Sequence, residues 1–212
     1  EASTAAYVGL PSFCRVTAKL SPSSDSDIKI ELWLPRSGWN GKLEAVGNWG
    51  WAGSIPFGSL AGAVAAGFAG AGTDTGHTGN NADFALGHPE KMIDFGYRST
   101  HEMAVQSKII VNAYYSAPVR FAYYNGCSQG GRQGLAEAQR YPQDFNGIVA
   151  GASAVDQMRM HAARTALNVE VNKDKDSVIP KAKYDMMHNA VMQLCDGLDG
   201  VKDGVIEDPA RF

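Results

Sequence analysis

The sequence lacks the features of a nucleic-acid-binding or membrane-spanning protein. Its 212 residues carry a net charge of −3 and contain no run of lysine and arginine, so there is no electrostatic basis for binding nucleic acid. No apolar stretch approaches the roughly 20 residues that a bilayer-spanning helix needs. The first residues, Glu1 to Thr4, have neither the basic nor the apolar region of a signal peptide, and we expect any such peptide to have been removed.

Cysteine is scarce, and Cys14, Cys127 and Cys195 form an odd set. Two interpretations are open at this point. The three residues can be free, buried thiols of a cytosolic protein, or they can be halves of disulfides in an exported protein whose partner cysteines lie outside this chain.

Glycine, in contrast, is abundant. Of the 24 glycines, many cluster between Gly38 and Gly87 without any repeat, which indicates tight turns and close backbone packing. The remaining composition, 44% hydrophobic and 19% charged, is that of an ordinary globular protein. The length suffices for one large domain, or for a domain and part of a second.

Predicted strands and helices alternate along the first three quarters of the chain. Alternating apolar residues predict a half-buried strand over 28–34, with Lys29, Glu31 and Trp33 on its outer side. The best predicted helix covers 98–115, with Met103 and Tyr114 on one face. The other predicted strands are 43–46, 68–73, 120–125 and 148–151, and the other helices are 60–66 and 130–140. This order favours an α/β fold, with a mostly parallel sheet and helices on both faces.

The composition changes near Val155. The last part of the chain is helical and polar, has no obvious core strands, and contains a loop rich in aspartate and glycine. We therefore predict two domains: residues 1–154 as the first part of an α/β catalytic domain, and residues 155–212 as the beginning of an inserted lid.

Residues Gly126 to Gly130 fit the pattern Gly-x-Ser-x-Gly, which follows a predicted strand and begins a predicted helix. In the α/β-hydrolase fold, this sharp turn lifts the serine hydroxyl above the sheet, and the flanking glycines avoid collisions. Ser128 is thus the predicted nucleophile. The turn also directs the amide of Gln129 and the helix N-terminus at the developing oxyanion. Cys127 could be proposed instead, but the residue before the central one points away from such a site, so a structural thiol or disulfide half is favoured.

Two other motifs point to different chemistry. Asp74-Thr75-Gly76 is found in aspartic proteases, but they need a second such aspartate and an all-β context. Gly70-Ala71-Gly72 follows an apolar run but continues into neither nucleotide-binding pattern. Both alternatives are disfavoured.

The chain resembles the tannase and feruloyl esterase family of α/β-hydrolases, which also includes the mono-hydroxyethyl terephthalate hydrolases. The blocks that carry the resemblance are residues 10–16, 34–35, 39–42, 73–77, 94–96, 101–102, 126–134, 141–142, 145–151 and 199–206. The resemblance implies that Ser128 is the nucleophile and that Cys127 forms a disulfide with a cysteine beside the catalytic histidine. It also implies that the 47–53 loop supplies a second oxyanion amide at Gly50, although Trp49 stands where relatives commonly have glycine.

The aspartate-rich loop resembles the calcium site of the family's lid. Asp196, Asp199 and Asp203 offer carboxylate oxygens, and turns at the intervening glycines can present the carbonyls of Val201 and Val205. The spacing is not that of an EF-hand, and on spacing alone a solvated acidic loop is an equal alternative. The resemblance implies structural Ca²⁺. Cys195 matches a lid cysteine whose partner would fall near Phe212.

The triad of an α/β-hydrolase runs serine, acid, histidine along the chain. After Ser128 the only histidines are His161 and His188, both in the predicted lid. The resemblance places the acid and the histidine beyond this chain, so we expect a segment of a longer protein, or one product of chain cleavage with a second fragment as partner. We expect His77 and His101 to be satisfied structural histidines, and His161 to be disfavoured as a substitute base.

These features predict a secreted or periplasmic carboxylic ester hydrolase. The expected substrates are small aromatic esters or phenolic esters linked to plant polysaccharides, with hydroxycinnamate esters first and gallate esters second. The alternative is a non-catalytic binding module of the same fold, which would lack the acid and the histidine.

Overall fold

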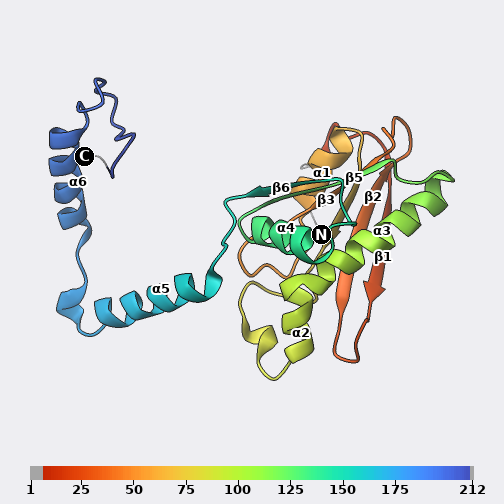
Figure 1. The fold of residues 1–212 in the computed structure, drawn as a ribbon, viewed down its shortest axis with the longest axis horizontal. Coiled ribbons are helices and arrows are strands. Elements are labelled where there is room, and N and C mark those ends of the chain that lie inside the picture. The colour runs from red at the N-terminus through yellow and green to blue at the C-terminus, as the bar shows by residue number, and fades with distance from the viewer. Residues whose placement is uncertain (1–6, 211–212) are drawn as a thin grey trace. The chain divides into compact units, whose positions relative to one another are not determined.

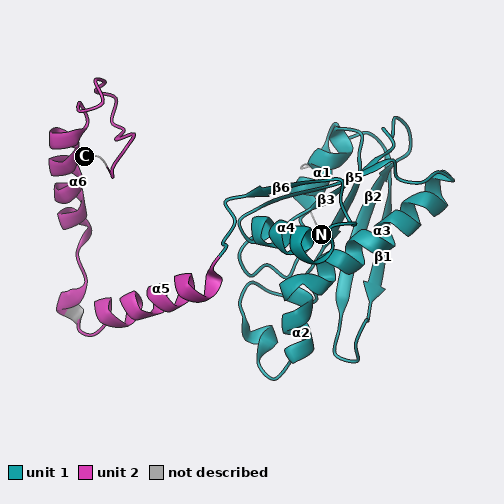
Figure 2. Cartoon of the chain, in the orientation of Figure 1, with its two compact units in different colours: residues 1–155 teal, residues 156–212 magenta. Residues whose placement is uncertain are grey.

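The computed structural model describes residues 7–210 (Figure 1), so the expectations that rest on the first residues and on Phe212 lie outside the described residues. The chain divides into two compact units, Glu1–Val155 and Asp156–Phe212 (Figure 2). This division falls one residue from the predicted domain boundary. The interpretation of the second unit as a lid stays a prediction.

Unit 1 is built on a six-stranded sheet with the order β1-β2-β4-β3-β5-β6. The four strands β4, β3, β5 and β6 run parallel, whereas β1 and β2 are antiparallel additions at one edge. The strands are β1 (Phe13–Leu20), β2 (Ile28–Pro35), β3 (Lys42–Val46), β4 (Ala69–Thr73), β5 (Phe121–Cys127) and β6 (Gly147–Gly151). The predicted α/β class is confirmed, but β1 was not predicted.

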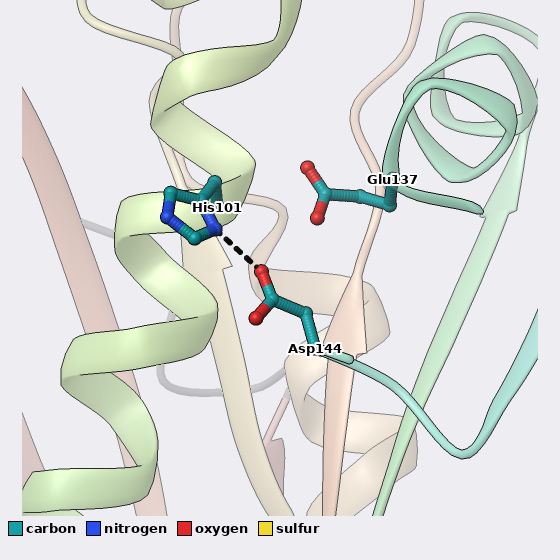
Figure 3. A group of neighbouring side chains, drawn as sticks. All are labelled: His101, Glu137 and Asp144. Atoms are coloured by element: carbon teal, nitrogen blue, oxygen red, sulfur yellow. Dashed lines mark hydrogen bonds and ion pairs between the residues drawn. The ribbon is translucent and has the colours of Figure 1, made fainter. Parts of the chain in front are cut away.

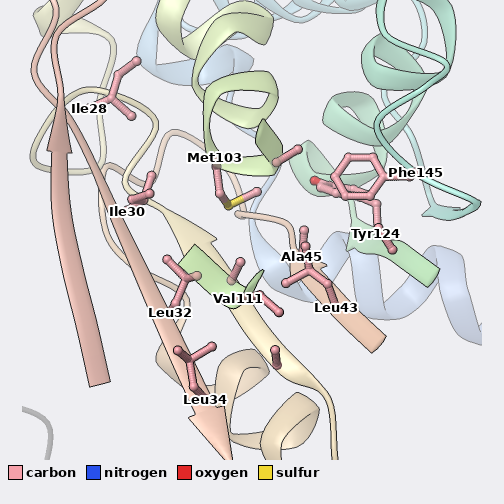
Figure 4. Packing of buried hydrophobic residues seen from close by; sticks show 14 residues of the cluster. Ile28, Ile30, Leu32, Leu34, Leu43, Ala45, Met103, Val111, Tyr124 and Phe145 are labelled. Atoms are coloured by element: carbon pink, nitrogen blue, oxygen red, sulfur yellow. The ribbon is translucent and has the colours of Figure 1, made fainter. Parts of the chain in front are cut away.

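Helices cover both faces of this sheet. The helices and helical turns of unit 1 are α1 (Phe57–Ala65), η2 (Asp83–Ala85), α2 (Pro89–Ile93), the π-helical turn η3 (Asp94–Arg98), α3 (Ser99–Tyr115) and α4 (Gln129–Arg140). On one face, Met103 and Val111 of α3 join the larger core with Leu32 and Leu43 (Figure 4). A smaller core holds Leu60 of α1 with residues from β2 and β3.

Strand β2 is buried on both faces, contrary to the half-buried pattern predicted for it. Only Lys29 is exposed, while Glu31 and Trp33 are 2% and 3% exposed. Trp33 stacks on Phe13 with ring centroids 4.4 Å apart and packs in the smaller core. The carboxylate of Glu31 accepts hydrogen bonds from the Trp33 indole at 2.6 Å and from the guanidinium of Arg15. A buried carboxylate is tolerated here because both partners come from the same sheet face.

The buried face of α3 also differs from the prediction. Met103 is fully buried, but Tyr114 is 41% exposed. The buried stripe instead runs through Thr100, Ser107 and Val111, at spacings of seven and four residues. The buried residues of α3 are Ser99, Thr100, Met103, Ala104, Ser107 and Val111, and three of these six carry a small hydroxyl side chain. Hydrophobicity alone assigns such residues to the outer face.

Unit 2 contains α5 (Gln157–Val171), the turn η4 (Lys175–Ser177), α6 (Lys181–Cys195) and the aspartate-rich loop. None of its side chains that the structure describes is buried, and large apolar side chains such as Met158, Met187 and Leu194 are more than half exposed. Across residues 7–210, no helix is both long and apolar enough to cross a bilayer.

Replacing Leu32 tests the position of the larger core. Leu32 is 0% exposed in the middle of β2, so Leu32→Ala leaves a cavity and should lower the free energy of unfolding by about 2–5 kcal/mol. The control Leu86→Ala removes a side chain that is 76% exposed and should change stability by less than ~0.5 kcal/mol. Urea unfolding measures both, and equal effects of the two substitutions would contradict the assignment.

Candidate active site

Ser128 lies in the sharp turn between β5 and α4. Its φ of 85° is rare for a residue with a side chain, and its amide donates to the carbonyl of Gly151, 3.0 Å away on β6. Such a conformation costs on the order of 1–3 kcal/mol and persists only where the surrounding structure imposes it. Ser128 is exposed, and its hydroxyl makes no hydrogen bond with any described residue.

The glycines of the motif permit a very close packing of backbone on backbone. A Cβ atom on Gly126 would lie 2.6 Å from the carbonyl carbon of Gly130, and a Cβ atom on Gly47 would lie 2.6 Å from the Cα of the same residue. Real side chains do not approach so closely. Glycine is therefore required where the start of α4, the end of β5 and the loop after β3 meet.

The loop after β3, Gly47 to Gly53, passes beside this turn and is called the oxyanion loop below. The amide of Ala52 donates to the carbonyl of Trp49 at 2.9 Å and closes a tight turn. Gly50 occupies the second position of that turn with a φ of 51°. Among the described residues, none accepts a hydrogen bond from the Gly50 amide. The oxyanion role of this amide stays a prediction.

Asn48 fixes the first half of the oxyanion loop to α4 and β4. The backbone amide of Asn48 donates to Oε1 of Gln133 at 3.0 Å. The side-chain amide of Gln133 donates in return to Oδ1 of Asn48 at 3.1 Å. The Asn48 side chain also donates to the carbonyl of Thr73 at 2.8 Å. Asn48 and Gln133 are 2% and 1% exposed, so these hydrogen bonds are shielded from water.

His77 and His101 are both satisfied by hydrogen bonds, as expected. His77 is 5% exposed and contacts Trp51 and Thr75 through its two ring nitrogens. Burial lowers the pKa of His77, which keeps the ring neutral. His101 bonds Asp144 through Nδ1 at 2.6 Å. Sequence reasoning missed how His77 supports the oxyanion loop, although the Asp74 to His77 motif had been singled out.

The three histidines of unit 1 make hydrogen bonds to residues other than Ser128. They are His77, His101 and His88, and His88 pairs with Asp25 at 3.0 Å. The prediction that the acid and the histidine of the triad come from outside this chain is therefore retained as a prediction.

Cys127 is exposed beside the nucleophile turn. It lines a half-open groove of about 450 Å³ together with Trp49, and one wall of the groove comes from Ser59 to Ala63 on α1. Trp49 is 54% exposed. Cys14 and Cys195 are partly buried, and all three cysteines are free thiols in the structure, so the predicted disulfides to partners outside the chain are untested.

The aspartate-rich loop of unit 2 is a series of turns capped by carboxylates. Each aspartate carboxylate accepts a hydrogen bond from a backbone amide further along the loop. The donors are Val201 to Asp199, Val205 to Asp203, and Gly204 to Asp196 at 2.8 Å. Carboxylate and carbonyl oxygens are the hard donors that Ca²⁺ prefers. In the part of the chain that the structure describes, however, these three carboxylates are not among the groups that lie close enough together to hold a metal ion, so the calcium site stays a prediction.

A second group of titratable side chains lies at the far end of α4 (Figure 3). The side-chain atoms of His101, Glu137 and Asp144 that could bind a metal lie within 4.8 Å of one another. His101 and Asp144 use those atoms for their hydrogen bond, and the ammonium of Lys108 lies 3.9 Å from Asp144. Glu137 is 0% exposed and points at this pair. Burial, with the charge of Asp144, raises the pKa of Glu137 to about 8. Both carboxyl oxygens of Glu137 are buried without a hydrogen-bond partner among the described residues, and the raised pKa favours the protonated form.

Comparisons with known proteins agree with this geometry. The family model described as tannase and feruloyl esterase matches residues 14–212. A probable feruloyl esterase B-1 of Aspergillus terreus is 40% identical over 197 residues, which are 92% of this chain and 37% of the relative. The crystal structure of feruloyl esterase B from Aspergillus oryzae superposes with a TM-score of 0.87 and 37% identity, over 94% of this chain and 40% of that one. Tannin acyl hydrolase from Aspergillus niger superposes with a TM-score of 0.78 and 29% identity, over 92% of this chain and 37% of that one.

The parallel sheet, the strained serine between strand and helix, and these structural likenesses define an α/β-hydrolase core. Within that class, the chain belongs to the tannase and feruloyl esterase family. It spans about 37% of the length of the curated relatives that it matches.

Replacing Glu137 tests its protonation. Because the pKa of Glu137 rises from the usual 4.5 to about 8 in the folded chain, the unfolded chain loses this proton first as pH rises. The group therefore stabilises the fold below pH ~4.5, and its contribution decreases by roughly 1 kcal/mol per pH unit until pH ~8. Glu137→Gln mimics the protonated form and should be more stable than the parent at pH 8, with a flatter pH profile.

Urea unfolding at pH 5 and pH 8 measures this difference. Glu170→Gln is the matched control, because Glu170 has a side chain that is 69% exposed. Parallel pH profiles for the parent and Glu137→Gln would show that Glu137 is ionised in the folded chain.

Proposed function

We propose that the protein is a carboxylic ester hydrolase that acts on esters of phenolic acids, with Ser128 as its nucleophile. The observation that carries this proposal is the exposed serine held at a φ of 85° between β5 and α4. That is the local geometry a nucleophile of this fold requires. Family membership supports the same reaction class.

In the proposed mechanism, the Ser128 hydroxyl attacks the ester carbonyl while a histidine takes its proton. That histidine, and the aspartate that orients it, are supplied by residues outside this chain. The backbone amides of Gln129 and Gly50 hold the oxyanion of the tetrahedral intermediate. The alcohol leaves with the proton from the histidine, and water then releases the aromatic acid from the acyl-enzyme.

Feruloyl esters are the favoured substrates, as small esters or linked to plant polysaccharides. Support comes from the higher similarity to feruloyl esterase B, with 37% identity and a TM-score of 0.87, than to tannin acyl hydrolase, with 29% and 0.78. Gallate esters are the second candidate. The alternative function is a non-catalytic binding module, which is a hydrolase fold without its base. Ester turnover by the full-length protein distinguishes an esterase from such a module.

We further propose that the protein is secreted or periplasmic and that Ca²⁺ stiffens unit 2 without taking part in bond breaking. The exposed thiol of Cys127 beside the nucleophile turn supports a disulfide formed in an oxidising compartment. Asp196, Asp199 and Asp203, with the carbonyls of Val201 and Val205, would hold the ion.

Replacing the serine tests the reaction class. In the full-length protein, Ser128→Ala should lower kcat for methyl ferulate by roughly 10³-fold or more, because no other group forms the acyl-enzyme. A fluorophosphonate should label the parent at Ser128 and leave the variant unlabelled, as read by peptide mass. Ser37→Ala, at an exposed serine before β3, is the control and should keep full activity. Retained turnover by Ser128→Ala would refute the proposed nucleophile.

Removing calcium tests the loop of unit 2. A chelator should lower the melting temperature of the full-length protein by several degrees, and added Ca²⁺ should restore it, since an ion that binds only the folded state stabilises that state. Asp203→Asn should abolish the response. Asp185→Asn, in the exposed ion pair with Lys181 on α6, should leave it intact. A melting temperature that is independent of Ca²⁺ would identify the loop as a solvated acidic segment.

A further inference from the structure

The oxyanion loop is held at both ends by residues that never reach the nucleophile. Asn48 fixes its first half, as described above. The second half contains the turn that presents the Gly50 amide, and the hydrogen bond from Ala52 to Trp49 closes this turn without attaching it to the rest of the unit. The residues after the turn are attached elsewhere, because the amide of Gly53 donates to the carbonyl of Gly79 at 2.7 Å and the Thr75 hydroxyl lies 3.5 Å from the carbonyl oxygen of Ala52. The attachment next to Gly50 in the chain is at the carbonyl of Trp51, the third position of the turn.

His77 provides that attachment. Its Nε2 lies 2.8 Å from the carbonyl oxygen of Trp51, and its Nδ1 lies 3.1 Å from Oγ1 of Thr75. A carbonyl oxygen only accepts, so Nε2 carries the proton. Burial lowers the pKa of His77 and favours the neutral ring, so the contact with Trp51 selects the tautomer protonated at Nε2. The Thr75 hydroxyl lies 3.1 Å from Nδ1 and 2.6 Å from the carbonyl oxygen of Asp74, and its single proton is shared between these two acceptors.

The imidazole ring has no room to turn. A Cβ atom on Gly53 would lie 2.5 Å from Cδ2 of His77, so the backbone of the oxyanion loop packs directly on one edge of the ring. Phe84 stacks on its face with centroids 3.8 Å apart. Thr75 is fully buried with a φ of 62°, a conformation that costs energy and that the surrounding contacts must enforce.

The same cluster connects the two amides assigned to the oxyanion. Phe95 lies edge-on to His77 at 5.6 Å and stacks on Trp51 at 5.2 Å. The guanidinium of Arg132 lies over the Phe95 ring at 5.4 Å and donates to Oε1 of Gln129 at 2.9 Å. A displacement of His77 therefore moves the Trp51 turn relative to the first residue of α4.

We propose that His77 is a positioning residue for ester hydrolysis: by holding the Trp51 carbonyl, it sets the Gly50 amide at the distance from Ser128 at which it can stabilise the oxyanion. This inference rests on the proposed esterase function. It assigns His77 no contact with the substrate and no proton transfer to it. Since an oxyanion donor acts only when correctly placed, its displacement should lower kcat while leaving substrate binding little changed.

Two substitutions test whether the hydrogen bond to the Trp51 carbonyl matters, or only the presence of a polar side chain at position 77. In the full-length protein, His77→Asn keeps an amide near the position of Nδ1 but is too short to reach Trp51. His77→Gln can place its amide nitrogen near the position of Nε2. With methyl ferulate, we expect kcat to fall by roughly 10–100-fold in His77→Asn with KM within about threefold of the parent. His77→Gln should recover most of the loss. His88→Asn, at an exposed histidine paired with Asp25, is the matched control and should keep the parental kcat.

A second readout reports on the oxyanion directly. The serine oxygen forms a bond to the carbonyl carbon of an aryl trifluoromethyl ketone while its proton passes to the proposed catalytic histidine of the full-length protein. The carbonyl π electron pair moves onto oxygen, and the resulting hemiketal alkoxide occupies the oxyanion site. Its inhibition constant should rise in His77→Asn by about the same factor as kcat falls. If His77 served only general stability, His77→Asn would lower the melting temperature and leave the inhibition constant of the folded enzyme unchanged.

The outcomes distinguish this inference from the proposed function. A kcat within twofold of the parent in His77→Asn, or His77→Gln no better than His77→Asn at equal melting temperature, overturns the role of His77. If His77→Asn does not fold, the pair Thr75→Val and Thr75→Ser decides: the valine variant should lose several-fold in kcat and the serine variant should keep it, and equal activities overturn the inference. Turnover that survives Ser128→Ala is a failure of the proposed function, whatever the histidine variants do.

Discussion

One backbone contact constrains the conformation of everything around Ser128. The reversal from β5 into α4 brings Gly126 and Gly130 within the space of a single methyl group, and Gly47 of the neighbouring strand end enters the same space. The chain can reverse so sharply only by forcing Ser128 to a φ of 85°. That strain, on the order of 1–3 kcal/mol, is offset by the packing of the sheet and helix that it joins, and it leaves the hydroxyl exposed.

The loop beside this turn is organised by buried polar side chains more than by apolar packing. Asn48 and Gln133 exchange hydrogen bonds between the loop and α4, and His77 holds the loop from the side of β4. Each of these groups is nearly inaccessible to water and has its partners in place. Because a buried polar group without its partner is costly, such a network has few alternative arrangements. A loop rich in glycine thus acquires a defined shape.

Much of this could be predicted from the sequence, and the failures have physical causes. The parallel strands, α3, α4 and the nucleophile turn follow from local periodicity and the Gly-x-Ser-x-Gly pattern. Strand β1 and the burial of Glu31 could not be predicted, since both depend on the pairing of β1 with β2 and on the cover that α1 gives to their outer face. The role proposed for His77 depends on its contact with Trp51, which lies 26 residues away in the sequence. A histidine in a sequence gives no indication of such a long-range partner.

The close approach of glycines has a consequence for altering this protein. A Cβ atom at position 47 or 126 would lie 2.6 Å from the backbone of Gly130, and one at position 130 would lie 3.0 Å from the carbonyl oxygen of Asn48. Substitution at any of the three positions must therefore displace backbone. Trp49, in contrast, is 54% exposed on the wall of the groove. Substitution at that position changes the wall of the groove and leaves the three glycine contacts in place, so the shape of the groove can be varied independently of the turn that holds Ser128.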